Sequence, residues 1–290
     1  MSTVAYEIVD VFTDRPFAGN PLAVVYEATE LGSDQMLTLT REFNLSETVF
    51  VLPPTAAEAT YRARIFTPEG EVPFAGHPSV GAAVTSMRRG MFGVGEVVQE
   101  CGAGLLPITV SDGRAVLTGA KPTLGEPLDP APLLAMAGLT ADDHAGTETA
   151  APRSAGCGLK WTFLQVRPEA LARVQIDLPA ARKIGVTELS VFSWDGEHAH
   201  ARVFAPGAAV PEDPATGSAA LGLGVWLVAA GRLPGSGTSA YTVHQNLDQR
   251  RPARLDCTVT AEDGAATSAT VAGSVVPIAS GRIAVPPFVG

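Results

Sequence analysis

Apolar residues along this chain fall mostly in short runs. The runs are rich in β-branched and aromatic residues and are bounded by Gly, Pro, Asp or Ser, a pattern that predicts β-strands. Examples are AYEIVDVF (5–12), NPLAVVY (20–26), ETVFVLPP (47–54), ATYRARIF (59–66) and AHARVFA (199–205). Because the strands do not alternate regularly with helices, the pattern predicts an α+β fold.

Helical patterns are fewer. Ser33 is a candidate N-cap, and the apolar residues that follow it lie on one helical face: Met36, Leu37, Leu39 and Phe43. Residues 129–144 (DPAPLLAMAGLTADDH) predict a second helix. The apolar run from Ala219 to Ala230 predicts a third, which is too short to span a bilayer. Its glycines, Gly222 and Gly224, cost about 1 kcal/mol each relative to Ala, so we expect other backbone to pack closely against this helix.

One pattern occurs twice. RIFTP (64–68) matches RVFAP (202–206), and Val72-Pro73 matches Val210-Pro211. Both matches have the same offset along the chain, which is close to half its length. In both halves a strand ends at a proline, a loop of Gly, Pro and acidic residues follows, and a helix of small residues begins. Duplication of one domain explains this order. We therefore predict domains over residues 1–118 and 119–280, with 281–290 as a candidate strand returning to the first.

Composition narrows the class of partner. The chain has 290 residues, 46% hydrophobic and 17% charged, as in a folded protein with a substantial core. Its formal net charge is −10 and no basic cluster interrupts the acidity, which argues against a nucleic-acid or anionic-membrane partner. The expected partner is a small molecule.

Targeting and redox signals favour the cytoplasm. The N-terminal MSTVAYEIVDVFTD lacks the basic start and apolar run of a secretory signal. Cys101, Cys157 and Cys257 are odd in number and have no metal-ligand spacing. We expect a reducing, cytoplasmic environment in which these thiols are buried or incidental.

The two small-residue helix starts are candidate anion sites, because a helix start presents free N–H groups and a partial positive charge. Gly76 and Gly217 allow a ligand to approach the backbone. His77 follows the first glycine, and Asp213 precedes the second start. Glu47 lies at the threshold of an apolar strand, where burial tends to raise a carboxyl pKa. Taken singly, these are common as helix caps, loop histidines or edge carboxylates; the repeat gives their joint placement meaning.

Other catalytic and cofactor motifs are absent. The sequence has no G-x-G-x-x-G after a strand, no phosphate-binding G-x-x-x-x-G-K-[ST], and no G-x-S-x-G around Ser79 or Ser218. Residues 197–200 (EHAH) could place two imidazoles on one strand face. No third ligand is spaced nearby, so a metal site is not predicted.

Five segments together resemble a known family. They are VDVFTDRPFAGNPLAVV (9–25), NLSETVFV (44–51), RIFTPEGEVPFAGHPSVGAA (64–83), DPATGSAALG (213–222) and, loosely, VHQNLDQRRP (243–252). They resemble the PhzF-like phenazine-biosynthesis proteins, which have the diaminopimelate epimerase fold. The resemblance covers essentially the whole chain. It implies two pseudo-symmetric domains, each a β-barrel-like sheet wrapped around a central helix, with the active site in the cleft between them.

The resemblance also assigns roles to residues. The acid–base residue of the family falls on Glu47, and its histidine and aspartate fall on His77 and Asp213. Substrate-binding positions fall on the two helix starts and on the N-terminal Gly-Asn motif: Gly76, Gly217, Ser218, Thr216 and Asn20. Members of the family need no metal or organic cofactor and commonly form homodimers. The resemblance therefore implies a homodimer without a cofactor here.

Two departures qualify the resemblance. Amino-acid epimerases of this fold use one cysteine at each helix start, whereas this chain has Gly76-His77-Pro78 and Gly217-Ser218-Ala219 there. Inversion through thiols is therefore not expected. PhzF-like members also usually have Gln-Gly followed by Gly-Arg-Pro-Ser, where this chain has Gln245-Asn246 and then Arg250-Arg251-Pro252-Ala253. Substrate contacts cannot be carried over to this loop.

The sequence thus favours a cofactor-independent isomerase that moves a proton on a small carboxylate-bearing substrate. Glu47 would be the main base and acid, assisted by Asp213 and His77. Two alternatives remain open: a racemase or epimerase that uses Glu47 and Asp213 on opposite faces of the substrate, and a ligand-binding or scaffold protein without turnover.

Overall fold

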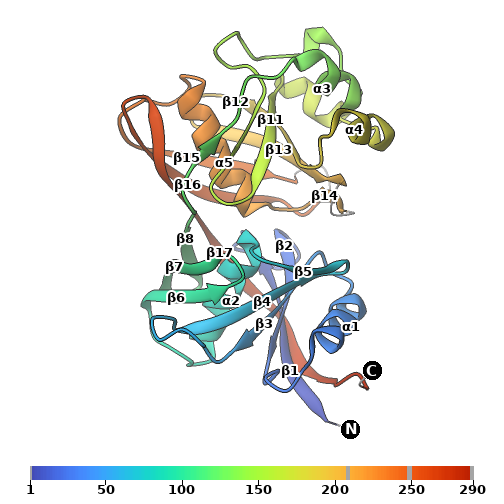
Figure 1. Cartoon of the computed structure of the whole chain (residues 1–290), viewed down its shortest axis with the longest axis vertical. Helices are drawn as coiled ribbons and strands as arrows, with labels where there is room; N and C mark the ends of the chain where they lie inside the picture. Colours follow the sequence, from blue (N-terminus) through green and yellow to red (C-terminus); the bar gives the residue numbers. More distant parts are fainter. Residues whose placement is uncertain (1, 207–209, 247–249, 288–290) are drawn as a thin grey trace. The chain divides into compact units, whose positions relative to one another are not determined.

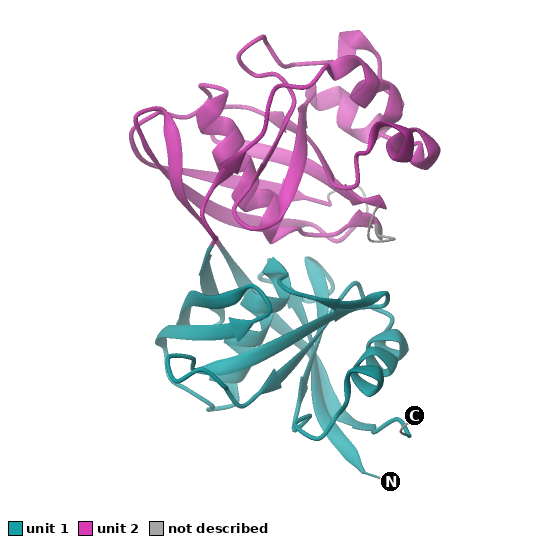
Figure 2. Ribbon diagram, in the orientation of Figure 1, with its two compact units in different colours: residues 1–118, 272–290 teal, residues 119–271 magenta. Residues whose placement is uncertain are grey.

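The computed structural model describes residues 2–206, 210–246 and 250–287. The chain forms two compact units, residues 1–118 with 272–290 and residues 119–271 (Figure 2). We expected the return to the first domain at residue 281. It begins earlier, at Ala272, because one long strand, β17 (Ala265–Ala284), continues from the second unit into the first. From Val275 onward this strand pairs antiparallel with β1 (Thr3–Val11).

Unit 1 is a barrel closed around a helix (Figure 1). Its strands pair in the ring β17–β1–β2–β3–β4–β6–β7–β8 and back to β17. The bounds are β2 Asn20–Tyr26, β3 Thr48–Leu52, β4 Tyr61–Thr67, β5 Gly70–Val72, β6 Gly95–Cys101, β7 Gly104–Ser111 and β8 Arg114–Thr118. Helix α2 (Gly76–Arg88) runs through the barrel and is buried from Gly76 to Ser86. Helix α1 (Ser33–Phe43) packs outside against β3 and β4.

Unit 2 repeats the plan around helix α5 (Gly217–Ala229). Its strands pair in the order β9–β10–β11–β12–β13–β15–β16. The bounds are β9 Thr123–Leu124, β10 Arg153–Gly156, β11 Lys160–Gln165, β12 Leu189–Trp194, β13 His198–Ala205, β14 Val210–Asp213, β15 Gly237–Gln245 and β16 Ala253–Glu262. Outside lie α3 Pro130–Met136, η1 Ala141–Asp143, η2 Pro168–Arg173 and α4 Leu178–Ile184. The predicted α+β fold, with a sheet wrapped around a central helix in each domain, is confirmed.

The predicted helices form, but their bounds differ from the prediction. The first begins at Ser33, but its N-cap is Gly32, whose N–H donates to Gln35 Oε1. The Ser33 hydroxyl instead accepts a hydrogen bond from Arg64 on β4 at 2.8 Å. Asp129 caps the helix that follows it, as its carboxylate accepts from the Ala131 N–H at 2.9 Å. Local sequence therefore predicts the starts of these two helices to within one residue. The second helix was expected to extend to residue 144, but it ends at Met136, because Gly138 has a left-handed backbone with φ of 69°, and a separate 3-10 turn, η1, follows.

Matching ion pairs support the predicted repeat. Arg64 of β4 binds Glu71 of β5 through Nε (2.8 Å) and Nη2 (2.6 Å). Arg202 of β13 binds Glu212 of β14 in the same two-pronged way, at 2.9 and 2.7 Å. Each guanidinium carbon also lies 5.2 Å from the ring centre of the phenylalanine two residues later on its strand. A two-pronged Arg–Glu ion pair thus fixes the hairpin that precedes the central helix in each unit.

Helix α5 is buried from Gly217 to Val228 and contains no charged residue. Such a helix, apolar all round, is stable only when it is enclosed on every side. β10, β11 and β16 pack against it. Within the described ranges, no helix is long and apolar enough to cross a membrane.

We predict that Gly222→Ala destabilises the protein, although Ala is the better helix former. An added Cβ would lie 2.8 Å from the Ala155 carbonyl oxygen and 3.2 Å from Gly156 Cα, both of them backbone atoms of β10. Overpacking of this kind costs about 1–3 kcal/mol, which outweighs a propensity gain of about 1 kcal/mol. Thermal unfolding should show a Tm lower by several degrees. Gly93→Ala is the control, because nothing lies within 4 Å of its added Cβ; a Tm for Gly222→Ala at or above the native value would contradict the prediction.

Candidate functional site

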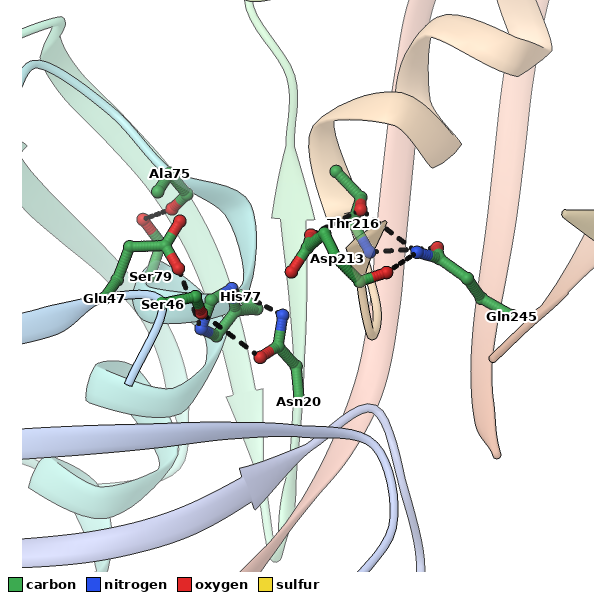
Figure 3. Close-up of polar contacts among 9 residues, drawn as sticks. All are labelled: Asn20, Ser46, Glu47, Ala75, His77, Ser79, Asp213, Thr216 and Gln245. Atoms are coloured by element: carbon green, nitrogen blue, oxygen red, sulfur yellow. Dashed lines mark hydrogen bonds and ion pairs between the residues drawn. The ribbon is translucent and has the colours of Figure 1, made fainter. Parts of the chain in front are cut away.

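Four predicted or neighbouring polar side chains meet at the start of α2 in unit 1 (Figure 3). Glu47 directly precedes β3, and its Oε2 lies 3.8 Å from Nε2 of His77, in the first turn of α2. Asn20, the first residue of β2, lies with its Nδ2 3.3 Å from Nδ1 of the same imidazole. Ser46 donates to Asn20 Oδ1 at 3.5 Å. The structure thus brings together Glu47, His77 and Asn20.

These contacts set the protons on the imidazole. Asn20 Nδ2 can only donate, so His77 Nδ1 is the acceptor and the neutral ring carries its proton on Nε2. That N–H is on the side of Glu47. Ser46 fixes which end of the Asn20 amide faces the ring. The sequence indicated Asn20 by its motif, but nothing in it indicated Ser46.

Glu47 is a carboxyl group largely removed from water. Its side chain is 19% exposed, and its Oε2 is buried with no hydrogen-bond partner among the residues described. Burial raises the pKa of Glu47, and a hydrogen bond with Ser46 opposes this rise only in part. A carboxyl group whose pKa is raised can both take and return a proton near neutral pH. The sequence-based expectation for this residue agrees with the direction of the shift.

A buried polar chain supports the start of α2. Tyr61 of β4 donates to Gln99 Oε1 of β6 at 2.9 Å, and Gln99 Nε2 donates to Ser79 Oγ at 2.9 Å. The Ser79 hydroxyl donates to the carbonyl of Ala75, the N-cap, at 2.9 Å. This chain ties the helix start to two barrel strands and holds Gly76 and His77 in place.

In unit 2, Asp213 is held by Thr216, the N-cap of α5, and by Gln245 (Figure 3). The Thr216 hydroxyl donates to Asp213 Oδ2. Gln245, at the end of β15, donates from Nε2 to the Asp213 carbonyl at 2.6 Å and to Thr216 Oγ1 at 3.1 Å. Its Oε1 accepts from the Thr216 N–H at 3.0 Å. Because Thr216 Oγ1 accepts from Gln245, its own proton is directed to Asp213.

Two predicted binding residues of unit 2 therefore already make hydrogen bonds within that unit. Thr216 is the N-cap of α5, and both its N–H and its hydroxyl are engaged within unit 2. Ser218 is 5% exposed, and its hydroxyl oxygen accepts from the Trp161 indole at 3.0 Å. Thr216 orients Asp213, and Ser218 keeps its own hydroxyl proton to donate. Their predicted contacts with substrate, like that of Gly217, stay predictions.

The predicted residues thus form one set in each unit. Asn20, Glu47, Gly76 and His77 belong to unit 1, and Asp213, Thr216, Gly217 and Ser218 belong to unit 2. The expectation that both sets serve one cleft concerns the placement of one unit relative to the other and stays a prediction.

Comparison with known proteins identifies the family. The model of the PhzC-PhzF family, described as phenazine biosynthesis-like protein, matches residues 9–281. The chain belongs to the PhzC-PhzF family. An uncharacterized isomerase of Mesorhizobium japonicum is 36% identical over 98% of this chain and 99% of its own length. The trans-2,3-dihydro-3-hydroxyanthranilate isomerase of Pseudomonas aeruginosa is 31% identical over 96% and 98%.

The solved structures agree on the fold. A phenazine biosynthesis protein of the PhzF family from Bacillus anthracis has a TM-score of 0.87 and 22% identity, covering 98% of this chain and 100% of that one. The sequence-based family prediction is confirmed. Several relatives that match this chain over nearly its whole length are named isomerases, and this PhzC-PhzF member is an isomerase as well.

The cysteines of this PhzC-PhzF isomerase lie away from both helix starts. Cys101 ends β6, Cys157 follows β10, and Cys257 lies within β16. Burial raises the pKa of the Cys157 thiol to about 12 and also raises the pKa of Cys101. Thiols with raised pKa values are poor proton acceptors at neutral pH. The three thiols therefore lie outside the two sets of predicted site residues.

The structure adds a third imidazole to the two predicted on one strand face. His200 of β13 pairs with His244 of the parallel strand β15. Their ring centres are 5.2 Å apart, and those of His198 and His244 are 5.5 Å apart. Even so, within residues 2–206, 210–246 and 250–287, no three His, Cys, Asp or Glu side chains are grouped so that they could hold a metal ion.

This imidazole cluster predicts an acid-sensitive stability. Burial lowers the pKa of His244, as do the charges of His200, His198 and Arg254, while Asp256 opposes them. The unfolded chain, with a His pKa near 6.5, then binds the proton more readily than the folded chain. Stability should fall as the pH drops below about 6.5. His244→Gln should reduce the loss of Tm between pH 7.5 and pH 5 by about 1–2 °C.

The control for this prediction is His198→Gln. That side chain is 43% exposed, so its removal should change the pH dependence of Tm less. Equal slopes of Tm against pH for the native protein and His244→Gln would contradict the assignment.

Proposed function

We propose that this isomerase shifts a proton between two carbon atoms of a small, unsaturated or cyclic substrate that carries a carboxylate. Glu47 removes the proton from one carbon, the double bond migrates, and the proton is delivered to another carbon. Atoms and charge balance without an oxidant or reductant, so the proposal includes no cofactor. Asp213 and His77 orient the substrate and assist the return of the proton.

One observation carries the proposal, namely the state of Glu47. Its carboxyl group is buried, its pKa is raised, and its Oε2 is free of hydrogen bonds within the part of the chain that the structure describes. A base that already accepted strong hydrogen bonds would hold its charge too firmly to take a proton from carbon. The neighbouring imidazole offers an N–H on the same side. Glu47 is thus suited to exchange protons with a ligand.

The helix starts support the second half of the chemistry. Loss of a proton beside a double bond leaves negative charge spread over the substrate. Backbone N–H groups and the partial positive charge at the starts of α2 and α5 can stabilise that charge and the carboxylate. We propose this role for Gly76, Gly217 and Ser218, with Asn20 and Thr216 as further substrate contacts.

The relative from Pseudomonas aeruginosa suggests a substrate class. Its name describes a dihydro, hydroxylated anthranilate, a cyclic unsaturated acid with an amino group. We propose a substrate of the same class: a cyclic or conjugated acid in which deprotonation gives a delocalised anion.

The test is solvent exchange. The protein is incubated in D2O with trans-2,3-dihydro-3-hydroxyanthranilate and with a panel of cyclic unsaturated carboxylic acids, and deuterium is located by NMR. Deuterium at a new carbon together with a moved double bond supports the proposal. Deuterium at the original carbon with inverted configuration, detected by chiral chromatography, would instead support a racemase or epimerase. Acids that stabilise the protein without any exchange would indicate a binding protein.

A further inference from the structure

We propose that Asn246 is a specificity-determining residue that binds a hydroxyl or amino group of the substrate through its side-chain amide. Asn246 follows Gln245 at the end of β15 in unit 2. The inference rests on the proposed function for the identity of the ligand as substrate. The evidence for a ligand contact is independent of the reaction.

The backbone at Asn246 is in the left-handed region, with φ of 64°. Glycine adopts this conformation without strain, and Asn is among the few other residues that tolerate it. Members of the family that this chain resembles usually have glycine here. This chain therefore has an amide side chain at a position whose backbone conformation favours glycine.

That side chain is nearly inaccessible and has no partner. Asn246 is 3% exposed, and neither Oδ1 nor Nδ2 has a hydrogen-bond partner among the residues described. Buried amides are almost always hydrogen-bonded, because an unsatisfied amide loses its contacts with water and gains nothing in return. Strain and an unsatisfied polar group at one residue are typical of a functional site. Both would disappear if the residue were glycine.

The position of Asn246 links it to the proposed site. The preceding residue, Gln245, has its whole amide engaged with Asp213 and Thr216 at the start of α5. The Asn246 amide is therefore carried by the same strand end that fixes Asp213. Its amide atoms are not open to bulk water, so a ligand group that satisfies them would lie at this strand end.

The chemistry of the amide indicates the kind of group. An Asn side chain offers both a donor and an acceptor. A carboxylate can only accept, so it would leave Oδ1 unsatisfied. A hydroxyl or amino group donates and accepts and can satisfy both atoms. We infer that Asn246 selects acids with such a substituent over acids that lack it.

The test combines a variant with a set of ligands. Native protein and Asn246→Gly are titrated calorimetrically with 3-hydroxyanthranilate, anthranilate, 3-hydroxybenzoate and benzoate. Asn246→Gly should weaken at least one of the three substituted acids by about five- to tenfold and leave benzoate unchanged. The same variant should raise Tm in the absence of ligand by about 2–4 °C, since it removes strain and an unsatisfied group.

Asp263→Gly is the matched control. Asp263 is exposed in the turn between β16 and β17 and also has a left-handed backbone, with φ of 50°. It reports the effect of placing glycine at such a backbone without the buried amide, and it should change no ligand affinity.

Several outcomes would overturn the proposal. These are equal weakening of all four acids, unchanged affinity for all four, no binding of any of them to native protein, or a lower Tm for Asn246→Gly, which would indicate a structural role. Substituent-dependent binding in a protein that exchanges no deuterium would leave the contact standing and reject the proposed reaction. Turnover of substrate together with affinities that Asn246→Gly does not change would support the proposed reaction and reject the Asn246 contact.

Discussion

Glu47→Gln should slow deuterium incorporation into the substrate about a thousandfold while leaving the protein folded. Gln has nearly the shape of Glu but cannot take a proton at neutral pH. The carboxyl group it replaces is 19% exposed and has a raised pKa, so the fold does not depend on its charge. Binding of a substrate analogue should change little, because the proposed carboxylate contacts lie at the helix starts. Rate of exchange by NMR and affinity by calorimetry separate the two effects.

Glu42→Gln provides the control for the loss of one carboxylate. Glu42 is exposed on α1, a few residues before Glu47, and its replacement should leave the exchange rate unaltered. Full exchange activity in Glu47→Gln would reject Glu47 as the base and direct attention to His77.

The second large effect is expected for Gln245→Leu, which should lower kcat/KM about a hundredfold. Leu fills a similar volume but makes none of the three hydrogen bonds that Gln245 makes to Asp213 and Thr216. The Thr216 hydroxyl would then be free to turn away from Asp213. The Thr216 N–H would also lose its partner, which costs about 1–3 kcal/mol for a buried donor, so Tm should fall as well.

Gln245→Glu sharpens this test. A carboxylate keeps the acceptor for the Thr216 N–H but faces the Asp213 carbonyl with an oxygen where Nε2 donated. Activity should therefore be lost even though one hydrogen bond survives. Thr238→Val, an exposed position on the same strand, is the control for changes on β15. Native kcat/KM in both Gln245 variants would show that Asp213 does not need this support.

Much of the architecture could be predicted because its signals are local or repeated. The strand runs, the helix after Asp129 and the two small-residue helices follow from short-range patterns. The repeat around Arg64 and Arg202 predicted two similar domains, and the matching ion pairs are its physical counterpart. Glu47, His77 and Asp213 were proposed as site residues because the motifs that carry them resemble those of the family, and the structure brings the first two together.

The supporting residues could not be predicted in the same way. Ser46 reaches Asn20, Gln99 reaches Ser79, and Gln245 reaches Thr216 only after the barrel strands have set their register. A Gln looks the same in sequence whether it is buried and supports a helix start or lies on the surface. The inward bond of Ser218 to Trp161 likewise depends on how β11 packs against α5. Sequence patterns carry no record of such pairings between distant segments.

The long strand β17 imposes an order of assembly on the chain. Its first part completes unit 2, which ends at Val271, and its second part supplies the strand that closes the barrel of unit 1 between β1 and β8. During synthesis, the first 118 residues emerge early but cannot close their barrel until residues 275–284 have left the ribosome. Unit 2, although encoded later, has all its strands before that point. The N-terminal half of this protein is therefore the last to be finished, with α2 and the Glu47–His77 pair enclosed only when the C-terminal strand arrives.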